Sequence, residues 1–170
     1  NHFHNARVSN HGTETSGRWR SGRSFEIYHN TFVMHMTASY ESVVKIRGGS
    51  GVVYNNRVSA DRNFNAFCVY SYFRSAAAYA PWGQAPNAWD GALMLDQPGA
   101  GKGDLLDSAF APTPRDLHQA LEVSYDWGNT INGAVSPCRS TSPHVVLGTH
   151  VKLEDHPPYV PYPYPHPKTL

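Results

Sequence analysis

The sequence predicts an all-β protein wound as a right-handed parallel β-helix, a solenoid, on three observations. Three short segments read alike, each with an aromatic residue, then His or Asn, then Asn, at residues 3–8, 27–32 and 53–58. Their central asparagines, Asn5, Asn30 and Asn56, recur at a nearly constant interval, which is typical of stacked repeats. Charged residues make up only 16% of the chain, which holds 14 Gly and 13 Pro, as in a turn-rich β protein.

Asparagine suits the bend between two strands of such a coil. It tolerates left-handed backbone angles, and its side-chain amide can hydrogen-bond to an amide on the next coil, about 4.8 Å away. We therefore expect Asn5, Asn30 and Asn56 to lie in one column. The alternative is that ordinary hairpin turns happen to contain these residues.

Residues 1–60 contain the strand patterns that this fold needs. Residues 24–28 alternate apolar and polar side chains, as in a half-buried strand, and residues 43–46 and 52–54 are rich in β-branched side chains. The glycine-rich run at residues 47–51 predicts a tight corner between two strands. This run lacks the strand, glycine motif and helix that together form a nucleotide-binding loop.

The second half of the chain has a different character. Residues 81–103 hold Trp, Pro and Gly in long loops, and residues 125–130 repeat the asparagine pattern, which indicates a final coil after an insertion. The tail at residues 157–167 is rich in Pro and Tyr and predicts an extended cap. We therefore expect one domain, with β-helix coils at residues 1–80 and the long-loop insertion, final coil and cap at residues 81–170.

Charge and composition narrow the expected partners. The net charge is +1 and the charged residues are interspersed, so the concentrated basic field that favours nucleic acid or an anionic membrane is missing. The chain contains no apolar run long enough for a membrane-spanning helix. Because residue 1 already lies inside a repeat, we expect an upstream part of a longer chain, or another subunit, to cap the first coil.

The two cysteines, Cys68 and Cys138, leave two alternatives open. In an oxidising compartment they could form one disulfide, and otherwise they are two free buried thiols. Their wide separation along the chain does not match a zinc motif.

Several segments carry a resemblance to a known family. They are residues 11–32, 46–56, 89–91, 95–101, 125–130 and 162–167. The chain resembles the C-terminal portion of bacterial exported right-handed parallel β-helix repeat proteins, of the pectate-lyase-like fold class. The resemblance covers nearly the whole chain, and it implies a secreted or cell-surface protein that binds or cleaves a polysaccharide. The chain departs from the family at Leu93 and Met94, where a Pro-Cys pair is expected.

A lyase of this class needs cations for the substrate carboxylate and a base for the α-proton. Arg18 and Arg47 are candidates for the first role, because guanidinium groups bind carboxylates in a bidentate manner. His11 and Glu14 are candidates for the proton transfer. The alternative for these residues is a set of surface ion pairs between coils, each worth at most about 1 kcal/mol.

A hydrolase would instead use two carboxylates, and Asp90 and Asp96 are the candidate pair because both lie in loops. Either aspartate could equally cap its own turn. Further candidates for sugar binding are aromatic or basic side chains, which could also be buried or ion-paired: Trp19, Arg20, Tyr28, Trp89 and Trp127.

Metal and cofactor requirements are not fixed by the residues. His2 and His4 fall on one side of a strand, but the pattern supplies no third ligand, so we assign no metal site. The need for a divalent cation such as calcium stays open. The leading hypothesis is an exported carbohydrate-active protein that binds, and in its stronger form cleaves, a polysaccharide. The competing hypotheses are a non-catalytic structural or adhesive module and an inactive fragment of a larger enzyme.

Overall fold

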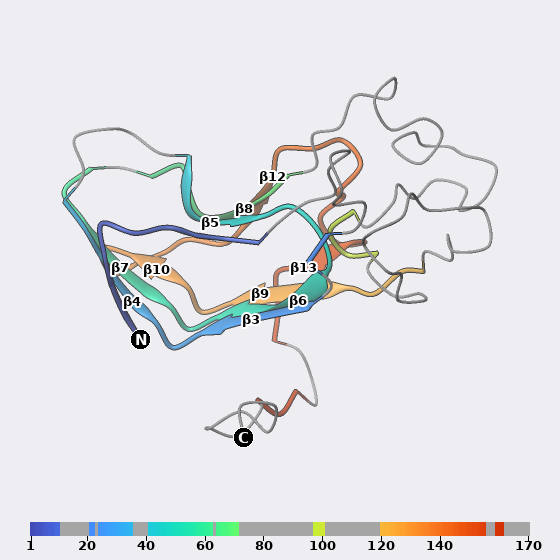
Figure 1. Cartoon of the computed structure of the whole chain (residues 1–170), viewed down its shortest axis with the longest axis horizontal. Helices are drawn as coiled ribbons and strands as arrows, with labels where there is room; N and C mark the ends of the chain where they lie inside the picture. The colour runs from blue at the N-terminus through green and yellow to red at the C-terminus, as the bar shows by residue number, and fades with distance from the viewer. Residues whose placement is uncertain are drawn as a thin grey trace.

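A computed structural model describes residues 1–10, 21–22, 24–35, 41–62, 64–71, 97–100, 120–155 and 159–161 (Figure 1). None of these residues is helical, and the described part of the chain contains thirteen strands. Eight of these strands lie between His2 and Tyr70, and five lie between Ser124 and Lys152.

The strands form three sheets, named here in spatial order. The first sheet contains β1 (His2–His4), β4 (Thr31–Met34), β7 (Arg57–Ala60), β10 (Thr130–Ile131) and β11 (Ala134–Val135). The second contains β12 (Arg139–Ser140), β8 (Ala66–Tyr70), β5 (Ser42–Ile46) and β2 (Val8–Ser9). The third contains β13 (Val151–Lys152), β9 (Ser124–Trp127), β6 (Ser50–Tyr54) and β3 (Ser24–Tyr28).

The prediction of an all-β chain is confirmed, but the predicted right-handed parallel β-helix is wrong, because the strands form three separate sheets rather than one solenoid. The interval that predicted uniform coils holds between β3 and β6, where Glu26 pairs with Val52. The next pairing in the same sheet joins Val52 to Tyr125, a far larger step along the chain. The first sheet also ends in an antiparallel pair, β10 with β11. The sequence repeat therefore reports parallel register between neighbouring strands and does not establish a continuous helical wall.

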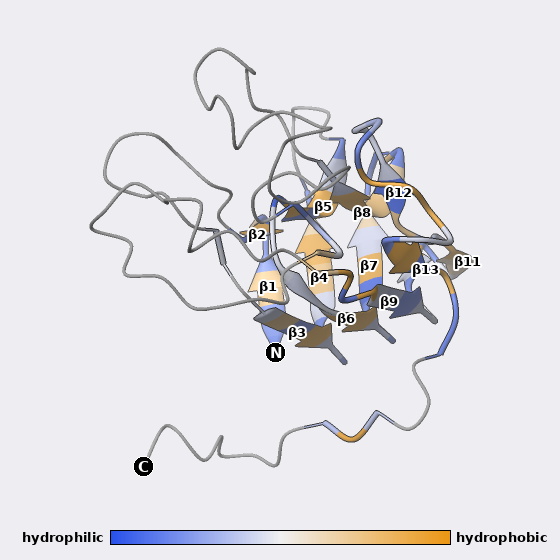
Figure 2. Cartoon of the chain, turned by 90° about the vertical axis from the view of Figure 1, so that its right-hand side faces the viewer, coloured by the Kyte–Doolittle hydropathy of each residue, from blue (hydrophilic) through white to orange (hydrophobic). Residues whose placement is uncertain are grey.

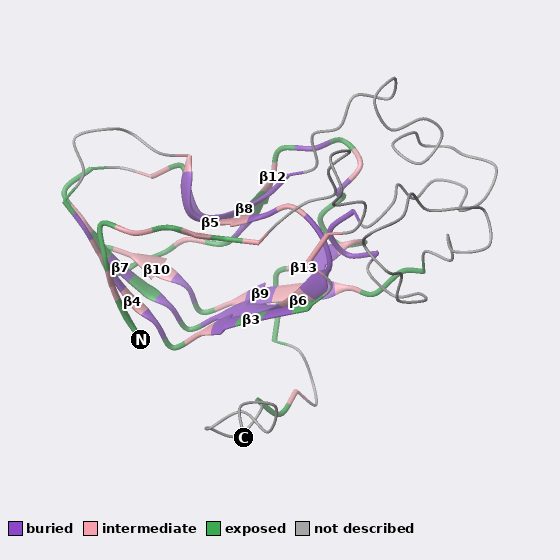
Figure 3. Ribbon diagram, in the orientation of Figure 1, coloured by how far each residue is buried: buried purple, intermediate pink, exposed green. Residues whose placement is uncertain are grey.

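The three sheets enclose one hydrophobic core. They lie on three sides of a common interior (Figure 2), and their inward side chains are buried (Figure 3). Phe32 of the first sheet contacts Phe67 of the second edge-on, with ring centroids 5.8 Å apart. Phe25 of the third sheet contacts Tyr70 of the second at 6.4 Å. Burial of such large side chains, each typically worth about 1.5–3 kcal/mol, holds the sheets against one another.

Gly51 permits a close approach between β3 and β6. The residue pairs with Phe25, and a Cβ atom at position 51 would lie 1.9 Å from the Phe25 carbonyl oxygen. Any side chain there would force the two strands apart. The glycine-rich corner predicted at residues 47–51 thus includes a position where packing requires glycine.

Buried asparagines form a column at the ends of the third-sheet strands. The Asn30 Nδ2 donates a hydrogen bond of 2.9 Å to the Asn56 Oδ1, and the Asn56 Nδ2 donates one of 2.8 Å to the Asn129 Oδ1. The Asn129 Nδ2 donates to the Asp126 Oδ1 at 2.6 Å. At the other end, the Asn1 Nδ2 donates to the Asn30 Oδ1 at 3.1 Å. We name Asn1, Asn30, Asn56 and Asn129 the asparagine column.

One member of the predicted column is wrong. Asn5 does not stack on Asn30, because the neighbour of Asn30 is Asn1. Asn5 lies after β1 and accepts a hydrogen bond of 2.6 Å from the backbone N–H of His35. Its φ of 49° is left-handed, as expected for an asparagine at a bend. The local pattern was correctly linked to a corner, but this corner belongs to a different sheet.

Candidate functional site

Most of the predicted site residues lie outside the described part of the chain. These are His11, Glu14, Arg18, Trp19, Arg20, Trp89, Asp90 and Asp96. The structure places three of the predicted residues, namely Arg47, Tyr28 and Trp127. The candidate site is therefore built from these three and from the described residues around them.

Arg47 joins two strands of the second sheet. It follows β5, and its Nε donates a hydrogen bond of 3.3 Å to the Asn10 carbonyl oxygen after β2. The Arg47 backbone N–H donates to the Asn10 Oδ1 at 2.6 Å. Arg47 is absent from the described lining of the pocket considered below. These contacts support the structural alternative for this arginine.

Tyr28 and Trp127 belong to one stack of aromatic rings. Parallel register places Tyr54 opposite both residues in the third sheet. The Tyr28 and Tyr54 ring centroids are 5.0 Å apart with an angle of 10° between planes. Those of Tyr54 and Trp127 are 4.3 Å apart with an angle of 6°. We name these three residues the aromatic column. Stacking between aromatic rings adds about 0.5–1.5 kcal/mol per pair.

Tyr54 was missed as a site residue, although the sequence carries a signal for it. Each ring of the aromatic column stands two positions before an asparagine of the asparagine column: Tyr28 before Asn30, Tyr54 before Asn56, and Trp127 before Asn129. Two adjacent columns with a common spacing could have been found from the repeat alone.

Tyr159, from the C-terminal segment, packs against the side of the aromatic column. Its ring meets Tyr54 edge-on at 5.8 Å and Trp127 at 6.4 Å. Burial and the nearby Glu26 carboxylate raise the pKa of the Tyr159 phenol well above its usual value. The phenol therefore stays neutral at physiological pH and acts as a hydrogen-bonding group.

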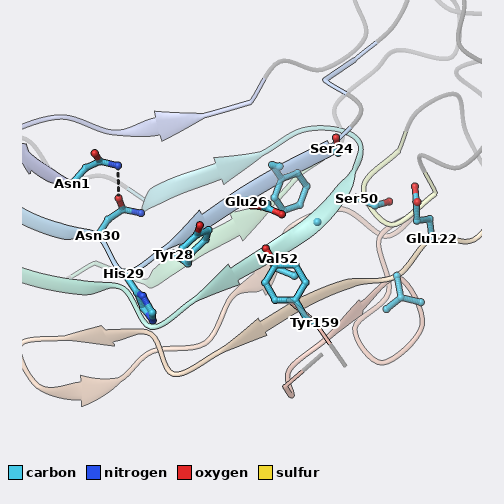
Figure 4. A pocket seen from close by; sticks show the side chains of 13 residues that line it. Asn1, Ser24, Glu26, Tyr28, His29, Asn30, Ser50, Val52, Glu122 and Tyr159 are labelled. Atoms are coloured by element: carbon cyan, nitrogen blue, oxygen red, sulfur yellow. Dashed lines mark hydrogen bonds between the residues drawn. The ribbon is translucent and has the colours of Figure 1, made fainter. Parts of the chain in front are cut away.

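A pocket of about 790 Å³ opens beside Tyr28 (Figure 4). Its described lining comes from the N-terminal residue, β3 and the bend after it, β6, the segment before β9 and the C-terminal segment: Asn1, Ser24, Phe25, Glu26, Tyr28, His29, Asn30, Ser50, Gly51, Val52, Glu122, Val123 and Tyr159. Glu26 and Glu122 are the carboxylates of this set. One face of the Tyr28 ring stacks on Tyr54. Among the described residues, no second ring stacks on its other face.

The described histidines do not assemble a metal centre. His4 lies beside His35, with ring centroids 5.6 Å apart, and the His35 Nδ1 lies 2.6 Å from the Asp61 Oδ2. No group of three or more metal-binding side chains occurs within the described ranges. Within the same ranges, no helix has the length and apolar character needed to cross a bilayer.

Comparison with known proteins gives no match: no family model, no curated protein and no solved structure matches this chain. The resemblance to exported β-helix repeat proteins stays a prediction.

Proposed function

We propose that this protein binds a carbohydrate chain in the pocket beside the aromatic column. The observation that carries the proposal is the terminal ring, Tyr28, which borders a pocket of about 790 Å³. Pockets that hold small ligands commonly measure roughly 300–1,000 Å³ and combine apolar surface with a few polar groups. The apolar face of a pyranose packs well on an aromatic ring. Export to the cell surface remains an expectation from the family resemblance.

The polar lining suits sugar hydroxyl groups. The Glu26 and Glu122 carboxylates can accept hydrogen bonds from neighbouring hydroxyls, and the Ser24 and Ser50 side chains can both donate and accept. Because two glutamates line the described part of the pocket, we favour neutral or amino sugars over uronic acids as ligands. A uronate would place its negative charge beside these carboxylates.

Cleavage is the stronger form of the proposal. Hydrolysis of a glycosidic bond commonly uses two carboxyl groups on opposite sides of the bond, and Glu26 and Glu122 both line this pocket. If the protein is a hydrolase, these two residues are its acid and base. A Glu26→Gln substitution would then abolish the release of reducing ends while leaving binding of the glycan measurable.

A non-catalytic structural module is the second candidate function. The specific observation that favours it is Tyr54, whose two ring faces are both covered by neighbouring rings. In that case the aromatic column stiffens the third sheet and has no ligand. The two functions differ in what happens when the terminal ring alone is removed.

The test is calorimetric titration of the folded protein with neutral, amino and uronic oligosaccharides. We expect binding of a neutral or amino sugar to weaken by about tenfold in Tyr28→Ala, since the stacking contact is worth about 1 kcal/mol or more. Tyr125→Ala is the matched control, because Tyr125 lies on the same sheet but outside the described pocket lining. Circular dichroism checks that both variants keep the fold. Silence of the wild type across the panel, or equal binding by Tyr28→Ala, would refute the proposal.

A further inference from the structure

The two cysteines stand side by side at the edge of the second sheet. Cys68 lies in β8, and Cys138 directly precedes β12. These strands pair in parallel, with Arg139 opposite Val69 and Ser140 opposite Tyr70. One residue earlier in this register, Cys138 comes opposite Cys68. Both side chains are buried and free in this structure, and their thiols are hydrogen-bonding neighbours.

We propose that Cys68 and Cys138 are the partners of a cross-strand disulfide that forms when the chain folds in an oxidising environment. Paired strands lie about 4.8 Å apart, and disulfides span Cα separations of about 4.4–6.8 Å, so the bond needs little movement of the backbone. The side chains point to the same face because the residues are level in the register. Of the two alternatives left open by the sequence, this geometry favours the bonded one.

The chemistry is a thiol–disulfide exchange. The two thiols lose two protons and two electrons to a small-molecule disulfide, such as oxidised glutathione. One sulfur–sulfur bond forms between Cys68 and Cys138, one breaks in the oxidant, and two small-molecule thiols leave. The oxidised chain is lighter by two hydrogen atoms.

The bond should form during folding, before the core closes. Burial raises the pKa of both thiols, and only the thiolate attacks a disulfide. The nearby Asp126 carboxylate acts in the same direction on both. Neither sulfur is accessible once the sheets have packed, because Cys68 is 0% and Cys138 is 1% exposed. The same burial protects the finished bond from reductants.

The cross-link would join β8 to β12 and close the long segment between them. A loop of this length corresponds, in the chain-entropy treatment, to a change of about a thousandfold in the unfolding equilibrium. Residues 72–96 and 101–119 lie inside the loop. The bond would therefore tie the two ends of the long insertion to one sheet.

The test is refolding of the wild-type chain from denaturant in a glutathione redox buffer and, separately, in excess reductant. We expect denatured samples from the redox buffer to show no titratable thiol, a mass lower by two hydrogens, and a Cys68–Cys138 cross-linked peptide after proteolysis. Their urea midpoint should also lie above that of the reduced protein. Cys68→Ser and Cys138→Ser are matched controls that should show no difference between the two buffers.

Two titratable thiols in wild-type protein refolded in the redox buffer would overturn the proposal. So would cross-linking only between separate chains, detected by non-reducing electrophoresis. Both readouts use the wild type, so they remain decisive even if the serine variants fail to fold.

Discussion

Removing one amide from the middle of the asparagine column should remove a large part of the protein's stability. Asn56 is fully buried, and its Oδ1 accepts hydrogen bonds of 3.0 Å and 2.9 Å from the backbone N–H and the Nδ2 of Asn30. Its Nδ2 donates to the carbonyl oxygens of Ile27 and Tyr54 and to the Asn129 Oδ1. The change to test is Asn56→Ala.

The magnitude follows from the groups left without partners. Alanine leaves two buried donors of Asn30 unpaired, and each orphaned group costs about 1–3 kcal/mol. We therefore expect the free energy of unfolding to fall by about 4 kcal/mol, out of the roughly 5–15 kcal/mol typical of a domain. The lost bonds to the two carbonyl oxygens add less, because a carbonyl oxygen with an unfilled lone pair is more easily tolerated than an orphaned N–H.

The measurement is urea unfolding followed by tryptophan fluorescence and circular dichroism. Asn55→Gly is the matched control: Asn55 is the exposed neighbour, and its φ of 51° suits glycine. We expect this control to stay within about 1 kcal/mol of the wild type. If Asn56→Ala also stays within that range, the column does not stabilise the fold as argued.

Two other substitutions test separate features. Gly51→Ala should cost about 3 kcal/mol or prevent folding, because the new methyl group would overlap the Phe25 carbonyl, whereas Gly133→Ala meets no atom within 4 Å and should cost about 1 kcal/mol; equal unfolding midpoints for the two variants would contradict this. Burial raises the pKa of Asp126 above its ordinary 3.8, so the folded chain holds a proton that the unfolded chain releases, and this group's contribution to stability falls as pH rises through its folded pKa. The unfolding free energy of the wild type minus that of Asp126→Asn should therefore decrease between about pH 4 and pH 7; a constant or rising difference in chemical denaturation would show that the pKa is not raised.

The repeat in the sequence predicted local structure better than global architecture. The spacing of Asn30 and Asn56 identified residues that do stack, and residues 125–130 were correctly matched to the same corner. Asn5 was misassigned because an asparagine also ends β1, where the left-handed backbone has the same preference. A short motif records the backbone angles that it needs and does not identify the sheet that contains it.

The candidate pocket could be predicted only in part. Tyr28 and Trp127 were recognised as candidate platforms from their residue type, whereas Glu122 and Tyr159 reach the site from segments far along the chain. Their place depends on how β9 and the C-terminal segment return to the third sheet. No local pattern around either residue encodes that return, so only the folded chain reveals them.

The bonds of the asparagine column all run in one direction. From Asn1 to Asn129, each amide nitrogen points toward the next oxygen along the column, and the last nitrogen points at the Asp126 carboxylate. The amide dipoles are therefore aligned head to tail with their positive end at an anion, an electrostatic arrangement like that at the start of an α-helix. This protein thus obtains from side chains alone a cooperative polarity that other folds derive from their main chain, and it uses this polarity to offset part of the cost of burying a negative charge.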